Sequence, residues 1–143
     1  MNHIRSIIGA TWLILLSFMP LTGHTGEVAV LVVTSRNATV SQQLSQQQIA
    51  DLFLGQSYGA SRLKPIDSSD EVLRERFYQE VAGMSANRAR AIWARLVFST
   101  RQVPPREMSP EAAAQQLLGS EDIITYLYRD HLPKGAKVLL TLP

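Results

Sequence analysis

The sequence predicts a small α/β domain, in which helices cover both faces of a mixed β-sheet. Two short apolar runs, 28–33 and 138–142, are rich in Val and Leu, as in strands that are buried on both faces. Between them, apolar residues recur every three or four positions, which is typical of amphipathic helices. The chain of 143 residues has no internal repeat and is long enough for one domain.

The first 26 residues are predicted to be a cleavable secretory signal peptide. Arg5 precedes an apolar run, 7–21, and small residues follow it. That run of about 15 residues is shorter than the roughly 20 that a membrane-spanning helix needs. The chain has no cysteine, so it lacks disulfides, a thiol nucleophile and a cysteine for lipid attachment. We therefore expect a periplasmic protein whose single domain is 27–143.

The first half of this domain is predicted to alternate strands and helices. Ser45 and Gln48 have the spacing of a capping box, and Gly55 ends the helix that they begin. Gly83 ends the second helix in the same way. The expected elements are a strand at 28–33, a helix at 45–54, a strand at 63–66 and a helix at 69–82.

The second half is predicted to hold two more helices and two strands. One helix carries an apolar stripe that includes Trp93, which we expect in the core. Another begins at Ser109 as N-cap with Pro110 in its first turn, and Gly119 ends it. The stripe consists of Ala89, Ile92, Trp93, Leu96 and Val97, and the expected later elements are strands at 123–128 and 138–142 with a turn at 133–135.

Several short pieces of the domain follow the order and spacing of a known family. They are Val28-Ala29-Val30-Leu31-Val32-Val33, Leu52-Phe53-Leu54-Gly55, Pro65-Ile66-Asp67, Arg74-Glu75-Arg76-Phe77-Tyr78, Trp93-Ala94-Arg95-Leu96-Val97-Phe98, Pro104-Pro105 and Val138-Leu139-Leu140. Over 27–143 the chain resembles small single-lobe relatives of the phosphate-binding, periplasmic substrate-binding proteins of ABC importers. The resemblance implies one lobe of a type II periplasmic binding protein, no cofactor, and a small oxyanion such as phosphate as ligand, for uptake or sensing.

The candidate ligand site is the junction between the strand at 63–66 and the helix that follows it. A helix N-terminus offers unpaired N–H groups and a positive dipole end to an anion. Ser68, Ser69 and Arg74 would add hydroxyls and a charge, helped by Thr34 and Ser35 after the first strand. The alternative is a capping box, in which Ser68 and Glu71 satisfy the helix end themselves.

A second candidate surface is the arginine-rich stretch 84–106, which contains no acidic residue. Arg88, Arg95 and Arg101 either cover the apolar stripe of their helix or bind a periplasmic or membrane protein. The domain would then be a ligand-free interaction module on the same fold, and a second copy of the chain is a further candidate partner. The formal net charge of +2 does not favour nucleic acid.

The sequence offers no constellation for catalysis or metal binding. His131 is the one histidine of 27–143, and there is no cysteine, Walker motif or dinucleotide loop. Gly55-Gln56-Ser57-Tyr58-Gly59 matches the hydrolase pattern Gly-x-Ser-x-Gly, but a predicted helix precedes it where a nucleophile elbow needs a strand. We therefore expect a non-enzymatic protein without metal or cofactor.

Overall fold

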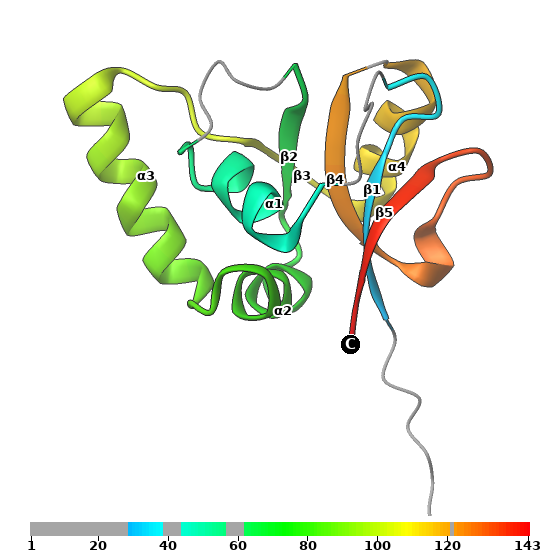
Figure 1. The fold of residues 1–143 in the computed structure, drawn as a ribbon, viewed down its shortest axis with the longest axis horizontal. Helices are drawn as coiled ribbons and strands as arrows, with labels where there is room; N and C mark the ends of the chain where they lie inside the picture. Colours follow the sequence, from blue (N-terminus) through cyan, green and yellow to red (C-terminus); the bar gives the residue numbers. More distant parts are fainter. Residues whose placement is uncertain (1–28, 39–43, 57–61, 121) are drawn as a thin grey trace, which may run out of the picture.

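The computed structural model describes residues 29–38, 44–56, 62–120 and 122–143, so the predicted signal peptide lies outside the described residues. Over these residues the fold is α/β, as predicted, with four α-helices and a five-stranded mixed sheet (Figure 1). The elements are β1 (Val30–Thr34), α1 (Gln46–Phe53), β2 (Lys64–Ser68), α2 (Glu71–Ala82), α3 (Ala86–Thr100), β3 (Arg106–Met108), α4 (Pro110–Gly119), β4 (Ile123–Tyr128), the 3-10 helix η1 (Arg129–His131) and β5 (Lys137–Leu142).

The strand order is β3-β2-β4-β1-β5, with β2 parallel to β3 and β4, and with β1 antiparallel to β4 and β5. Thr34 at the end of β1 pairs with Ile124, and Ile124 pairs with Pro65 near the start of β2. The carboxyl ends of β1 and β2 therefore lie at opposite ends of the sheet.

Both faces of the sheet are buried, because β1 sends alternate side chains into two separate apolar clusters. Val30 and Val32 pack on the side of α1 and α2, whereas Leu31 and Val33 pack on the side of α4. On the first side, the rings of Phe77 and Tyr126 are stacked with their centroids 3.8 Å apart. Figure 1 shows α1, α2 and α3 on one side of the sheet and α4 on the other.

Several helix ends follow local sequence signals, and the start of α2 is an exception. Ser45 forms the predicted capping box with Gln48, Ser109 caps α4, and Gly83 ends α2 in the left-handed conformation. The capping box predicted for Ser68 and Glu71 is wrong, because Asp70 caps α2 by accepting from two backbone N–H groups.

The exception arises from β3, a strand that the sequence did not reveal. Its three residues, Arg-Glu-Met, contain no apolar run, yet they pair in parallel with β2. Because Met108 pairs with Ser68, β2 continues two residues beyond the predicted end at Ile66. As a result, α2 begins at Glu71, two residues after the predicted start at 69.

Candidate functional site

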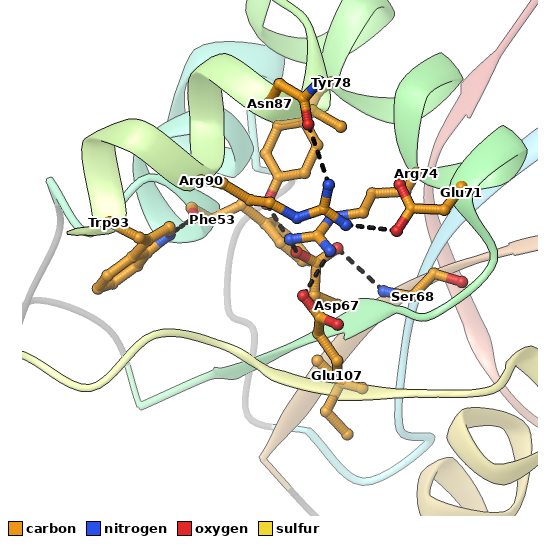
Figure 2. A network of polar contacts seen from close by, with 12 residues as sticks. Phe53, Asp67, Ser68, Glu71, Arg74, Tyr78, Asn87, Arg90, Trp93 and Glu107 are labelled. Atoms are coloured by element: carbon orange, nitrogen blue, oxygen red, sulfur yellow. Dashed lines mark hydrogen bonds and ion pairs between the residues drawn. The ribbon is translucent and has the colours of Figure 1, made fainter.

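The carboxyl end of β2 holds a buried charge network around Arg74, in the first turn of α2 (Figure 2). Arg74 Nη2 lies 2.9 Å from Asp67 Oδ2, and both side chains are almost fully buried. Arg74 Nη1 also donates to Glu107 of β3, whose side chain is half-exposed. Two carboxylates of the protein thus neutralise the cation that the sequence predicts for a ligand.

The Asp67 carboxylate is surrounded by donors from three elements. Asp67 Oδ1 accepts from the backbone N–H of Ser68 at 2.9 Å and from the Tyr126 hydroxyl of β4. Asp67 Oδ2 accepts from the Tyr78 hydroxyl of α2 at 3.1 Å, in addition to Arg74. Backbone amide, hydroxyls and guanidinium are the donors expected around a bound oxyanion, and here they bind an anion of the chain itself.

Burial and neighbouring charges shift the pKa values of Asp67 and Arg74 in opposite directions. Burial raises the pKa of Asp67 above its ordinary 3.8, although the Tyr126 hydrogen bond and the Arg74 charge partly offset it. Burial lowers the pKa of Arg74, but the Asp67 and Glu107 carboxylates outweigh it and raise that pKa overall. Arg74 therefore stays charged at any physiological pH, and Asp67 is the group of this pair whose charge can vary.

Ser68 ends β2 and Ser69 follows it, and each makes a hydrogen bond within the fold. Ser68 Oγ accepts from the backbone N–H of Asp70 at 3.1 Å, and the N–H of Ser69 donates to Met108 O at 3.0 Å. Glu71 does not fold back over the helix end and pairs with Arg90 of α3. Anion binding at this junction remains a prediction that would require displacing carboxylates already in place.

A groove of about 420 Å³ opens beside this network. It has apolar walls from α3 and from the segment before β3, and charged residues at its base. The lining charges balance in number, with two arginines and two carboxylates: Arg74 pairs with Asp67 and Glu107, and Arg90 pairs with Glu71 outside the lining. The lining residues are Asp67, Arg74, Arg90, Trp93, Ala94, Val97, Pro104, Pro105 and Glu107.

Thr34 and Ser35 lie elsewhere, which corrects the expectation that they assist Ser68, Ser69 and Arg74. Thr34 aligns with Pro65 through β4, and Ser68 stands three residues further along β2, about 10 Å away in that direction. Thr34 Oγ1 is buried and donates to Ile123 O at 2.5 Å. The five predicted ligand residues therefore form two groups, one at each end of the sheet.

Ser35 lines a pocket of about 180 Å³ where three segments converge. Because Thr34 pairs with Lys137 across antiparallel strands, the residues just after β1 lie beside those just before β5. The end of α4 closes the third side. The pocket is lined by Ser35, Arg36, Asn37, Leu117, Leu118, Ser120, Lys134, Gly135 and Ala136.

Among the described residues, the charges that line the Ser35 pocket are not balanced. Arg36 and Lys134 are exposed cations, and no Asp or Glu is found among the described residues that line the pocket. The Arg36 guanidinium lies against Gly135, where an added Cβ would come within 3.2 Å of Arg36 Nε and Nη2. Gly135 also has a φ of +95°, so glycine both permits this turn and leaves room for Arg36.

The hydroxyl of Ser35 is the most informative polar atom of this pocket. Ser35 is only 2% exposed, and its Oγ has no hydrogen-bond partner in the part of the chain that the structure describes. A buried hydroxyl without a partner costs roughly 1–3 kcal/mol, so such atoms normally bond to water or to a ligand. Ser35 belongs to the same pocket lining as Arg36 and Lys134, whose two positive charges match a small anion.

Sequence reasoning named Ser35 but missed most of its neighbours. Arg36 and Lys134 become neighbours only through the β1–β5 pairing, which no local pattern reveals. The sequence did contain a signal for Asp67 and Tyr78. Asp67 is an acidic residue near the end of β2, and Arg74 precedes Tyr78 by one turn on the buried side of α2.

No family model, curated protein or solved structure matches this chain. Among the described residues there is no cluster of three or more His, Cys, Asp or Glu that could hold a metal ion. Within the same ranges, no helix is long and apolar enough to span a bilayer.

Proposed function

We propose that this chain is an exported, non-enzymatic domain that binds a small oxyanion such as phosphate in the Ser35 pocket. One observation carries the proposal: the buried Ser35 hydroxyl has no partner among the described residues, and Ser35 lines the same small pocket as Arg36 and Lys134. Hydroxyl and guanidinium donors beside an ammonium are the groups that bind tetrahedral anions.

The electrostatic balance of the pocket favours an anion. The carboxyl end of α4, which carries a partial negative charge, disfavours one by about 0.3–1 kcal/mol. Each cation at about 4 Å contributes about 1 kcal/mol in water, rising to about 4 kcal/mol at the effective dielectric of a protein surface. The contributions of Arg36 and Lys134 therefore exceed the opposing dipole.

Size restricts the ligand to a few atoms. Pockets for drug-sized molecules are roughly 300–1,000 Å³, and this one is about 180 Å³. It is also open to solvent, since Arg36, Asn37 and Lys134 are exposed. Binding by this single lobe should be weak, which suits a periplasmic sensor or a domain that shares its ligand with an uptake system.

A thermal-denaturation titration with phosphate and sulfate tests the proposal. The purified protein is compared with the double variant Arg36→Gln/Lys134→Gln and with the control Arg106→Gln/Arg129→Gln, which loses the same charge elsewhere. Phosphate at 100 times its dissociation constant adds about 2.7 kcal/mol of stability. We expect this gain in the wild type and the control and its loss in the pocket variant.

Two results would contradict the proposal. One is an equal response to phosphate in all three proteins, which would indicate a nonspecific salt effect. The other is a response that survives in the pocket variant but disappears in Ser69→Ala, which would place the anion at the junction predicted from sequence. Sodium chloride at matched ionic strength separates specific binding from screening.

A further inference from the structure

The second half of α3 is the least covered helical surface of the described residues. Of its 15 residues only Ala86, Ala89 and Trp93 are buried, and the first two belong to its first turns. Phe98 is 90% exposed, and Val103 in the segment after the helix is 76% exposed. Figure 1 shows α3 as the outermost element on its side of the sheet, packed mainly against α2.

A groove of about 430 Å³ runs along α3 on the side away from the Arg74 network. Its base is apolar, formed by Ala91, Ile92 and Leu96, and Gln56 closes one side. Arg88 and Arg95 stand at the groove seven residues apart, which is about 10.5 Å along a helix. An apolar base between two cations at a fixed separation is a directional recognition surface.

Neither arginine is neutralised by a carboxylate of the described ranges. Arg90 of the same helix pairs with Glu71, whereas Arg88, Arg95 and Arg101 form no ion pair with another described residue. The stretch 84–106 contains five arginines and no Asp or Glu. An occupant of the groove must therefore supply the negative charge.

The charge pattern also decides between candidate partners. A second copy docking through the same face would bring its own Arg88 and Arg95 against these two, and like charges in an interface cost several kcal/mol. Nucleic acid would prefer a broader basic surface than a chain with a net charge of +2 presents. Complementarity favours an acidic partner with apolar side chains.

We propose that the α3 groove binds an acidic, amphipathic segment of a partner protein. Two carboxylates of the segment pair with Arg88 and Arg95, and the apolar side chains between them pack on Ile92 and Leu96. Two glutamates seven positions apart on a helix match the separation of the two arginines. Phe98 extends the apolar contact beyond the groove. This inference concerns a different surface from the anion pocket and does not depend on it.

Fluorescence anisotropy with a designed peptide tests the proposal on the purified protein. The probe is a labelled helical peptide of about four turns, with two glutamates seven positions apart and leucines between them. A matched peptide carries glutamine at both positions. We expect the glutamate peptide to bind at least about fivefold more tightly than the glutamine peptide, with affinity that falls as salt rises.

Three variants locate the binding. Arg88→Gln/Arg95→Gln should weaken the glutamate peptide by about tenfold and remove most of its salt dependence, as the loss of two partly shielded ion pairs predicts. Phe98→Ser should weaken both peptides alike, because it removes an apolar contact only. The control Arg62→Gln/Arg129→Gln has the same charge loss away from α3 and should bind normally.

Several outcomes would overturn the proposal. These are no binding of either peptide at millimolar concentration, equal binding of the two peptides, or an unchanged affinity in Arg88→Gln/Arg95→Gln. A single-stranded oligonucleotide that binds more tightly than the glutamate peptide would assign the groove to nucleic acid instead. Because every substituted side chain is exposed, circular dichroism should show all variants folded.

Discussion

The two ends of the sheet contain similar donors with opposite uses. At the carboxyl end of β2, Arg74 and two tyrosine hydroxyls surround Asp67, an anion that belongs to the chain. At the carboxyl end of β1, Arg36 and Lys134 lie beside a buried Ser35 hydroxyl with no carboxylate among the described lining residues. The charges of the first end are paired, although Arg74 Nε also lacks a hydrogen-bond partner among the described residues, whereas the second end has surplus positive charge.

The type of donor alone therefore does not identify a ligand site. A constellation whose charges cancel internally contributes to the fold, because removing any member leaves another buried charge uncompensated. A constellation with surplus charge and an unbonded buried donor is available to a ligand. Perturbing each end should therefore affect different properties, namely stability at one end and anion affinity at the other.

The largest expected effect is at Arg74. Replacing it in Arg74→Met keeps much of the apolar stem but leaves the buried Asp67 carboxylate without its cation. Breaking a buried pair by removing one partner costs roughly 3–5 kcal/mol. Urea denaturation at neutral pH should show that loss, while the response of the folded fraction to phosphate should stay as in the wild type.

Arg90→Met is the matched control for Arg74→Met. Arg90 pairs with Glu71 across α2 and α3, but both side chains are substantially exposed, so the pair should contribute within about 1 kcal/mol. A loss at Arg90 as large as that at Arg74 would show that the burial of the network is not what makes Arg74 important. Loss of the phosphate response in Arg74→Met alone would return the anion site to the β2 end.

A smaller effect is expected for the two tyrosines. Tyr126→Phe removes both a donor to Asp67 and an acceptor for the Ser68 N–H, so we expect a loss of roughly 1.5–3 kcal/mol. Tyr78→Phe removes one bond of 3.1 Å and should fall at the low end of that range. Urea denaturation of both variants measures this order, and a larger loss for Tyr78→Phe would contradict it.

The pH dependence of the free energy of unfolding provides a second test of the Tyr126 prediction. Because the pKa of Asp67 is raised by folding, the folded state holds its proton longer than the unfolded state, and stability falls as pH rises from 3.8 through the folded pKa. Tyr126 lowers that pKa, so Tyr126→Phe should widen this window of falling stability. Denaturation curves from acidic to neutral pH would show a deficit that grows with pH; a constant deficit would mean that Asp67 does not titrate there.

Much of the fold could be predicted from local signals in the sequence. The continuous apolar run of β1 indicated a strand buried on both faces, and the caps at Ser45, Gly83 and Ser109 set three helix ends. Trp93 is buried as expected and donates its Nε1 hydrogen to Phe53 O at 2.8 Å. The short strand β3 had no such signal, because its pairing with β2 is determined by tertiary contacts.

The site was harder to predict because it depends on strand direction. Placing Thr34, Ser35 and Ser68 together assumed that β1 and β2 run in parallel, but the intervening β4 is antiparallel to β1. Reversing one strand moves its carboxyl end to the other end of the sheet. Local patterns identify strands and leave their direction in the sheet undetermined, so the five candidate residues were grouped at one end of the sheet although the structure places them at two.

The smallest expected effect on stability, and the clearest distinction between the two ends, is at Ser35. Ser35→Ala removes a buried hydroxyl that has no partner among the described residues, so the free energy of unfolding should stay unchanged or rise by up to about 1 kcal/mol. A hydrogen bond to a charged ligand contributes about 1.5–3 kcal/mol, so phosphate should bind at least about tenfold more weakly. Calorimetric titration and urea denaturation of the same sample measure both quantities. A clear loss of stability with unchanged phosphate affinity would show that the hydroxyl serves the fold, and that the β1 end is as self-contained as the β2 end.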